Sequence, residues 1–421
     1  MEKTLPLWNN LRSKPAFRVW RHRDFRLYET GMTLYSITGW MMRVGIGWLA
    51  WELTRSTAWL GVIAAADLGP MIVFAPFAGA VADRMDSLVL TRLAQFLLML
   101  QAILLAVLIF ADTMSIHALL AIALYGGVLY PFAGAGRQTL LPRTVPFEEF
   151  APAIALDSAL FQVARFIGPA LAGIAIASAG VAAAFVAHAM GSVLFQTILA
   201  NLRPPPQAQR SRGQRNLFRD IGAGFAYVRR HPGIGPVFLL MTTTSIFIRP
   251  VQDMLPAFAG RVFAGGPREL AVLTSSIGVG AMFSAGMIAL RGGVSGLTLR
   301  IFLGFIGLAL STLALVASDN FALGVVSAGF LGFTLNTMST STQALTQSAV
   351  ENNMRGRVMS LYLLIFRGMP AVGSIFAGYI AEIFGLRPTF AVGAAFCLAI
   401  WLYAMPKRHA IARAMEGEGG R

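Results

Sequence analysis

The sequence predicts an all-α polytopic membrane protein with 12 transmembrane helices in two pseudo-symmetric six-helix bundles. Three observations predict this fold class. Of the 421 residues, 56% are hydrophobic and only 13% are charged, whereas soluble domains carry roughly 25% charged residues. The apolar stretches are long and continuous, as spanning helices of ~20 residues require, and lack the short alternation of a membrane β-barrel. The third observation is an internal repeat that relates the two halves of the chain.

The predicted spans are joined by several short connections, so neighbouring helices run antiparallel. They cover residues 25–51, 57–81, 88–111, 115–140, 152–179, 181–201, 234–260, 269–290, 296–317, 320–348, 358–384 and 386–406. Breaks at Gly69-Pro70, Gly168-Pro169 and Gly292-Gly293 fall within or beside spans. Inside lipid, such breaks require that protein or a water-filled cavity satisfies the freed backbone groups.

The distribution of Lys and Arg predicts the orientation. The outward connections hold only Arg55, Arg261, Arg268 and Arg387, and nearly all other Lys and Arg fall on the side of the two termini. By the positive-inside rule, both termini are predicted to be cytoplasmic, in the inner membrane of a bacterium. The N-terminal stretch shows no apolar run with a cleavage site, so the first span is expected to be the insertion signal.

The longest connection predicts the domain organisation. Residues 1–201 and 234–421 would form the two bundles, and residues 202–233 a basic cytoplasmic linker. The linker begins rich in Pro and Arg, and residues 216–231 predict a short amphipathic helix on the inner leaflet. The formal net charge of +15 is therefore interpreted as anchoring to the lipid bilayer, and no nucleic-acid partner is predicted.

A shift of about 206 residues aligns the two halves. The segment "GAVADRMDSLVLTR" (79–92) aligns with "GMIALRGGVSGLTLR" (286–300), and "FIGPALAG" (166–173) with "PAVGSIFAG" (370–378). The same shift places Arg43 on Arg249, each in the middle of a span. Duplicated halves are typical of secondary transporters that bind substrate at the interface of the repeats.

The paired arginines are the central functional hypothesis. A guanidinium inside the membrane is costly and is tolerated where it faces a wet cavity or a partner. We expect Arg43 and Arg249 to face a midplane cavity and to bind an anionic group of a small-molecule substrate. The alternative is structural neutralisation, of Arg249 by Asp253 and of Arg43 by Asp67. Either carboxylate is also a candidate for the coupling proton, because burial and a nearby arginine shift its protonation in opposite directions.

The stretch "GAVADRMD" resembles the signature of the major facilitator superfamily in the connection between spans 2 and 3. Gly79, Asp83 and Arg84 match, whereas Asp86 replaces a glycine and Ser87-Leu88 a basic pair. The resemblance implies a gating role for these residues, with Asp83 locking one closed state. Arg137 or Arg355 would be its partner.

Longer stretches resemble a narrower branch of that superfamily, the enterobactin-exporter-like or transmembrane secretion effector group. They are "WLAWELTRSTAWLG" (48–61), "LLPRTVPFEEFAPAIALDSALFQVARFIGPALAG" (140–173), "FRDIGAGFAYVRRHPG" (218–233) and the region 354–385. The resemblance implies the major facilitator fold, with spans 1, 4, 7 and 10 lining the cavity. It also implies export of a siderophore-like compound. Arginines on spans 1 and 7 resemble those of organophosphate antiporters, which supports an anionic ligand.

The stretch "ARFIGPALAG" resembles the antiporter signature of span 5, with matches at Gly168, Pro169 and Gly173. Small residues let two helices pack closely, and proline bends the span. Generic tight packing is the alternative interpretation. On the same span, Asp157 and Arg165 share a face and are interpreted as a structural or gating network rather than as ligands.

The remaining candidates are polar or aromatic residues within spans. Asn336 and Thr337 lie on an unusually polar span 10, and Thr244 lies in the run "TTTS"; we expect them to bind substrate, with interhelical hydrogen bonds as the alternative. Trp40 could flank an aromatic ligand. Arg367 has a gating and a packing interpretation that the sequence leaves open. Glu29, near the inner end of span 1, is interpreted as snorkelling towards the interface.

These features predict a proton-coupled secondary transporter that exports a small organic anion or amphiphile by alternating access, acting as a monomer. The sequence contains no phosphate-binding loop, no metal-ligand spacing and no nucleophile–base cluster, so neither a cofactor nor an enzyme activity is predicted. The alternatives are an organic-anion:proton symporter that imports, a lipid flippase, and a receptor that binds without transport.

Overall fold

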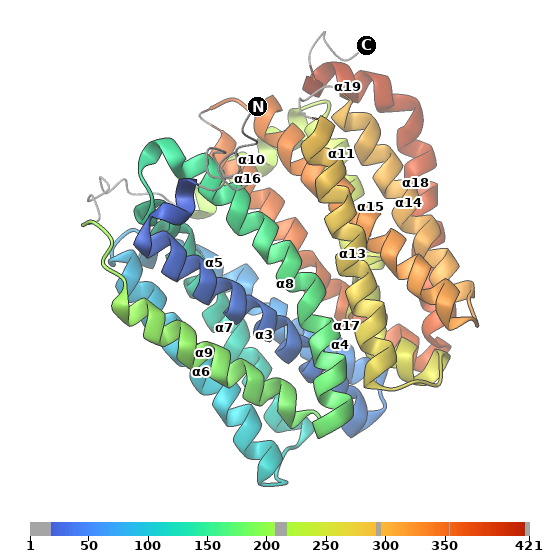
Figure 1. Ribbon diagram of the computed structural model, residues 1–421. Helices are drawn as coiled ribbons and strands as arrows, with labels where there is room; N and C mark the ends of the chain where they lie inside the picture. Colours follow the sequence, from blue (N-terminus) through green and yellow to red (C-terminus); the bar gives the residue numbers. More distant parts are fainter. Residues whose placement is uncertain (1–17, 207–216, 292–295, 353, 417–421) are drawn as a thin grey trace, which may run out of the picture. The chain divides into compact units, whose positions relative to one another are not determined.

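The computed structural model describes residues 18–206, 217–291, 296–352 and 354–416, and every regular element within them is a helix (Figure 1). The α-helices are α3 (Arg23–Thr54), α4 (Thr57–Leu68), α5 (Pro70–Ala82), α6 (Ser87–Phe110), α7 (Ile116–Leu140), α8 (Phe150–Ala179), α9 (Ala182–Asn201), α10 (Leu217–Arg230), α11 (Ile234–Phe247), α12 (Leu255–Ala257), α13 (Pro267–Arg291), α14 (Leu297–Ala317), α15 (Phe321–Ala349), α16 (Arg355–Leu363), α17 (Met369–Phe384), α18 (Leu386–Ala404) and α19 (Arg408–Glu416). Shorter 3-10 or π turns are η1 (Val19–Arg21), η2 (Leu141–Thr144), η3 (Phe147–Glu149), η4 (Arg249–Gln252), η5 (Phe258–Val262), η6 (Leu364–Gly368) and η7 (Met405–Lys407).

Within the described residues, eleven helical segments are long and apolar enough to cross a membrane. They correspond to eleven of the predicted spans. The other predicted span, 25–51, lies in α3, a helix of 32 residues whose charged and polar side chains keep its hydropathy below that of the rest. The chain is therefore a multi-pass, all-helical membrane protein, and the count of 12 stays a prediction.

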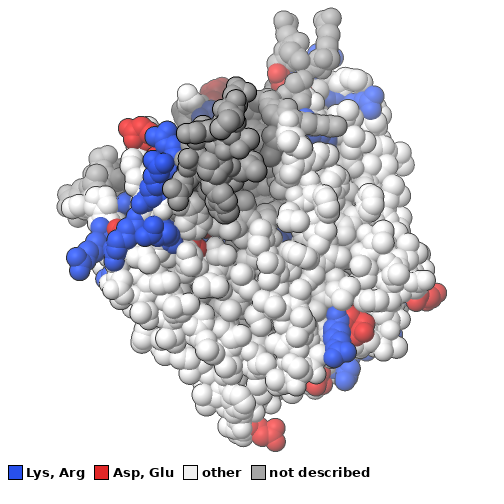
Figure 2. All heavy atoms as spheres, in the orientation of Figure 1, with Lys and Arg blue, Asp and Glu red and all other residues white. Residues whose placement is uncertain are grey.

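The exposed surface of the helices is apolar. Phe110, Ile383 and Val392 are 72%, 75% and 69% exposed, and many other large apolar side chains are exposed as well. On the face shown in Figure 2, charged side chains gather near the ends of the helices, and the flanks between carry almost none. So much exposed apolar surface is stable only against lipid.

The chain packs into two compact units that do not follow the order of the sequence. Unit 1 holds the described residues of Met1–Gly45, Val73–Met114 and Val128–Arg212, and unit 2 those of Ile46–Ile72, Ser115–Gly127 and Gly213–Arg421. Three helices, α3, α5 and α7, therefore contribute to both units.

The predicted division at the linker, into residues 1–201 and 234–421, stays a prediction. Helix α10 occupies most of the segment predicted to be amphipathic. Residues 207–216 of the linker and the predicted break at Gly292-Gly293 lie outside the described residues.

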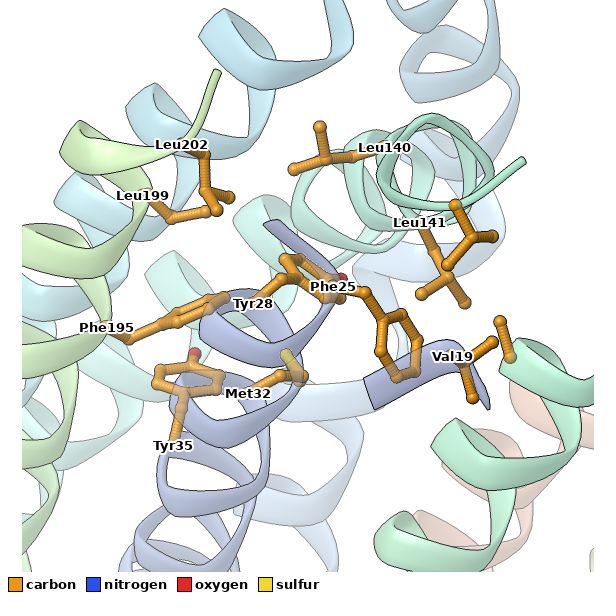
Figure 3. Packing of buried hydrophobic residues seen from close by; sticks show 12 residues of the cluster. Val19, Phe25, Tyr28, Met32, Tyr35, Leu140, Leu141, Phe195, Leu199 and Leu202 are labelled. Carbon is orange, nitrogen blue, oxygen red and sulfur yellow. The ribbon is translucent and has the colours of Figure 1, made fainter. Parts of the chain in front are cut away.

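Unit 1 has an aromatic core at the beginning of α3. Tyr28 packs edge-on against Phe195 of α9 with ring centroids 6.0 Å apart, and Tyr35 lies 5.3 Å from the same ring. Figure 3 shows these side chains with Phe25 and Met32 among leucines of α7, η2 and α9. The core fixes the first four turns of α3 against its neighbours, so the polar side chains of α3 are held in place as well.

A close helix contact at a glycine occurs in each unit. In unit 1, a Cβ atom on Gly168 of α8 would lie 2.5 Å from Cβ of Trp40 and 2.6 Å from the carbonyl oxygen of Ile37. In unit 2, a Cβ atom on Gly373 of α17 would lie 2.8 Å from Cα of Ile246 and 2.9 Å from Pro250. Gly168 and Gly373 are equivalent in the predicted repeat, which agrees with two halves built alike.

Predicted span 234–260 is not one regular helix. Helix α11 ends at Phe247 and is followed by η4, α12 and the π turn η5. Pro250 explains the break, because it has no N–H to donate to the preceding turn and its ring excludes the regular path. Arg249 therefore lies on an irregular turn and not in the middle of a helix.

Helices α4 and α17 are joined within unit 2 by a carboxylate. Glu382 accepts hydrogen bonds from the backbone N–H and the hydroxyl of Thr57, at 2.7 and 2.8 Å, and from the hydroxyl of Ser56 at 3.2 Å. A carboxylate at a helix N-terminus satisfies N–H groups that have no partner within the helix and interacts favourably with the helix dipole. Glu382 thus ties the beginning of one predicted span to the end of another.

Replacement of Gly168 by Ala is expected to destabilise the protein by about 1–3 kcal/mol, because the added methyl group meets Trp40 and a backbone oxygen that cannot move freely. The measurement is the free energy of unfolding in detergent. Gly134→Ala on α7 is the matched control, since a Cβ there meets nothing within 4 Å and Ala favours helix. Equal stability of the two variants would show that α8 and α3 are not in tight contact.

Candidate functional site

One face of α3 carries three polar side chains of unit 1. Glu29, Ser36 and Arg43 are spaced by seven residues, so they return to nearly the same side of the helix. Helix α8 presents Asp157, Phe161 and Arg165 at intervals of four, which also share a face. The side chains of these two faces form two groups. One lies around Arg43 and Arg165, and the other around Glu29 and Asp157.

The first group is Arg43, Trp40 and Arg165. The guanidinium carbons of Arg43 and Arg165 lie 5.8 and 5.6 Å from the centre of the Trp40 ring. The Phe161 ring lies 6.2 Å from the same indole. Trp40 and Arg43 were predicted to bind substrate and Arg165 to belong to a gating network; the structure brings the three together.

Two cations on one indole make a suitable site for an anion. Each gains from the π face of the ring, but their like charges repel in an environment of low polarity. A bound anion would relieve that repulsion and accept hydrogen bonds from both planar guanidiniums. Among the described residues, no ion pair involving Arg165 occurs.

The second group lines a small pocket between α3, α7 and α8. Its lining residues are Glu29, Met32, Thr33, Ser36, Arg137, Asp157 and Phe161. The Glu29 side chain is 1% exposed, and its Oε2 atom has no hydrogen-bond partner. Arg137 donates to the sulfur of Met32 at 3.8 Å. The prediction that Glu29 snorkels to the interface is wrong, because its side chain is buried in the pocket between α3, α7 and α8.

Glu29 was not among the predicted site residues. The signal that identifies it is its position two heptads before Arg43 on the same helix, which places both side chains on one face. Burial of Glu29 depends on α7 and α8, which come much later in the chain. Arg137 and Asp157, predicted as gating or structural residues, lie in this pocket.

In unit 2, Arg249 lies against an aromatic pair. Its guanidinium carbon is 4.3 Å from the centre of the Phe366 ring, and it donates a hydrogen bond to the Phe366 carbonyl oxygen. Phe366 stacks on Tyr362 with centroids 5.7 Å apart. Arg367 follows on the same π turn, η6, and is exposed. Irregular π turns are frequent at functional sites, and an arginine beside an aromatic ring recurs here as in unit 1.

The two carboxylates predicted to carry the proton are half-buried and lie in unit 2. Asp253 accepts a hydrogen bond of 2.7 Å from the Ser374 hydroxyl of α17. Asp67 lies near the end of α4, where its carbonyl would be 2.8 Å from a Cβ atom on Gly127. Their role in proton coupling stays a prediction.

The polar residues of span 10 make interhelical contacts. The hydroxyl oxygens of Thr337 and Ser284 of α13 are 2.7 Å apart, and Asn336 donates to the same Ser284 oxygen at 3.2 Å. The hydroxyl of Thr244 is buried and donates to carbonyl oxygens of its own helix. These bonds agree with the alternative of helix packing, and substrate binding by the three residues stays a prediction.

The connection between α5 and α6 contains the superfamily signature. Gly79, Asp83 and Arg84 are exposed, and within the described chain neither charged residue forms an ion pair. Asp86, the residue that replaces a glycine of the signature, accepts hydrogen bonds from the backbone N–H of Leu88 and Val89 and caps α6.

Asp86 also pairs with Arg143 at 2.9 Å, and Arg143 donates to the carbonyl oxygen of Pro205 at 2.7 Å. Partial burial acts to raise the pKa of Asp86, but the cap hydrogen bonds and Arg143 outweigh it and lower that pKa. The departure from the signature thus creates an ionic contact between this connection and the segments before α8 and after α9.

The arrangement of apolar spans around buried polar groups is that of a polytopic membrane transporter. The family model for the transmembrane secretion effector matches residues 15–416. The chain belongs to this family of the major facilitator superfamily, as the signatures predicted. The relatives are transporters and not enzymes, and a transporter of this family acts on a small molecule. Among the described residues, no cluster of three or more His, Cys, Asp or Glu could hold a metal ion.

Curated relatives extend over most of the chain. The chain is 22% identical to the staphyloferrin A transporter of Staphylococcus aureus over 364 residues, which are 85% of this chain and 90% of that protein. It is 21% identical to macrolide efflux protein A of Streptococcus pyogenes over 391 residues, 91% of this chain and 96% of that protein. The relatives of this chain thus include an efflux transporter.

Solved structures share the fold. A transporter of the POT family, in complex with 5-aminolevulinic acid, matches with a TM-score of 0.74 at 10% identity, covering 92% of this chain and 96% of that chain. A nucleoside transporter matches with a TM-score of 0.69 at 14% identity, covering 91% and 98%. At such low identity the likeness concerns the fold alone, and it confirms the major facilitator architecture.

Replacement of Asp86 by Asn is expected to lower the melting temperature at neutral pH. Asn can still cap the helix, so the variant removes mainly the charge. Because the pKa of Asp86 is lowered in the folded protein, its stabilising contribution is present above the unfolded value of about 3.9 and is lost as the pH falls through the folded pKa.

The melting temperatures of the two proteins should therefore begin to converge as the pH falls below about 4, and should become equal once the pH is below the lowered pKa of Asp86 in the folded protein. Glu148→Gln, an exposed acid in the connection before α8, is the control and should change little at either pH. A gap between wild type and Asp86→Asn that persists unchanged in acid would contradict the ionic contact.

Proposed function

We propose that this protein is a proton-coupled exporter of a small organic anion or amphiphile in a bacterial inner membrane, with both termini cytoplasmic. The observation that carries the proposal is the group of Arg43, Trp40 and Arg165, in which two guanidiniums lie within 6 Å of one indole. Such a group suits a ligand that combines negative charge with an apolar or aromatic part.

The relatives support the direction of transport. One is named a transporter of staphyloferrin A and another a macrolide efflux protein. We propose that this chain exports a siderophore-like anion, moving it by alternating access as a monomer. Substrate and proton would each bias the equilibrium between two conformations according to their affinity for each. Arg249, which repeats the pairing of arginine with an aromatic ring, is proposed as a second substrate contact.

Transport by the protein in membrane vesicles is expected to depend on an imposed pH gradient. The measurement is uptake of staphyloferrin A, and separately of a macrolide, into everted membrane vesicles with the gradient present or collapsed. Uptake that is unaffected by collapse would contradict proton coupling. Accumulation in right-side-out vesicles would indicate import by symport, and movement of a labelled phospholipid in place of both solutes would indicate a flippase.

Arg43→Gln and Arg165→Gln are each expected to weaken binding of the transported anion roughly tenfold or more. Each loses a charge-assisted hydrogen bond, worth about 1.5–3 kcal/mol. The measurement is the dissociation constant of the purified protein for the solute that it transports. Arg268→Gln changes an exposed arginine beyond these clusters and should leave that constant unchanged. Unchanged affinity in both Arg43→Gln and Arg165→Gln would refute the anion site.

A further inference from the structure

The geometry points to Glu29, together with Asp157, as the group that binds and releases the coupled proton. This inference rests on the proposed proton-coupled function and assigns its proton site to the pocket between α3, α7 and α8 rather than to Asp67 or Asp253. The pocket is complete within unit 1.

Glu29 is buried inside unit 1. Its side chain is 1% exposed, and its Oε2 atom has no hydrogen-bond partner. An ionised carboxylate out of water with an unpaired oxygen is strongly unfavourable, whereas a protonated one is not charged and can donate a hydrogen bond. Binding of a proton to Glu29 therefore removes the free-energy cost of burying an ionised carboxylate.

Charged groups from two other helices share the pocket with Glu29. Asp157 of α8 and Arg137 of α7 line the same pocket, and no two of these three residues form an ion pair within the described chain. Tyr28, the preceding residue, is buried with an unpaired hydroxyl. Two carboxylates near one arginine carry a net negative charge, so the pocket is balanced when it holds one proton.

The pocket is small. The space between its lining side chains does not admit a water-sized sphere, so neither a hydrated metal ion nor an organic substrate fits in this conformation, whereas a bound proton adds no such volume. In a conformation that opens the pocket to one side of the membrane, hydronium would give a proton to a Glu29 carboxylate oxygen. In one that opens it to the other side, the same proton would return to water.

The pocket lies beside the group of Arg43, Trp40 and Arg165. Phe161 lines the pocket, and its ring lies 6.2 Å from that of Trp40, beside which the guanidiniums of Arg43 and Arg165 lie. Asp157 and Arg165 are eight residues apart on α8, which corresponds to about 12 Å along the helix. Protonation in the pocket and substrate binding at the arginines therefore act on the same two helices. This arrangement would couple proton binding to substrate binding.

The test is infrared difference spectroscopy of the full-length protein in liposomes, between neutral and acidic pH. A C=O band of a protonated carboxyl group should appear in wild type, be lost in Glu29→Gln and be shifted in Asp157→Asn. Glu52→Gln is the matched control, because Glu52 is an exposed glutamate on the same helix, and it should keep the band. Glu29→Asp retains a carboxyl group and should restore a band, which separates loss of the proton site from misfolding.

A second readout is transport of staphyloferrin A or of a macrolide into everted vesicles. In Glu29→Gln the dependence of uptake on the pH gradient should be lost, while exchange of labelled for unlabelled solute continues. Persistence of the infrared band in folded Glu29→Gln, or its loss in Asp67→Asn or Asp253→Asn instead, would overturn the assignment. If uptake by the wild-type protein does not depend on the pH gradient, the proposal that transport is proton-coupled is wrong. The infrared result still decides whether Glu29 binds a proton.

Discussion

The close packing of α8 on α3 at Gly168 is the contact on which the polar centre of unit 1 depends. Charged side chains in an apolar bundle are stable only when protein groups surround them. With no side chain at Gly168, α8 can lie directly against Trp40, and its Arg165 and Asp157 then reach the polar face of α3. Pro169 removes one backbone N–H beside this contact. The small-residue signature of this span thus acts first through packing, whatever it contributes to antiport.

Phe161 belongs to two groups of opposite character. It lies 6.2 Å from the indole of Trp40, which is beside two arginines. It also lines the pocket that holds two carboxylates and a single arginine. Both groups therefore depend on the same pair of helices, α3 and α8.

The two units share a packing plan but not its details. A glycine contact joins Gly168 to α3 in unit 1 and Gly373 to α11 in unit 2. An arginine lies beside an aromatic ring in both units. Arg249, however, lies on an irregular turn and donates to a backbone oxygen, whereas Arg43 lies in a continuous helix. Pro250 makes this difference.

The sequence by itself determined the membrane class, the superfamily and most of the spans, because hydropathy and helix length are local properties that lipid imposes on each segment. It also drew attention to Arg43, which a shift of about 206 residues aligns with Arg249. Only the tertiary structure decided that Glu29 is buried and that Arg165 shares an indole with Arg43. Burial and contact depend on which helices meet. The residues that meet, such as Arg43 and Arg165 or Glu29 and Arg137, are more than a hundred positions apart in the sequence, so no local pattern in α3 reveals what covers it.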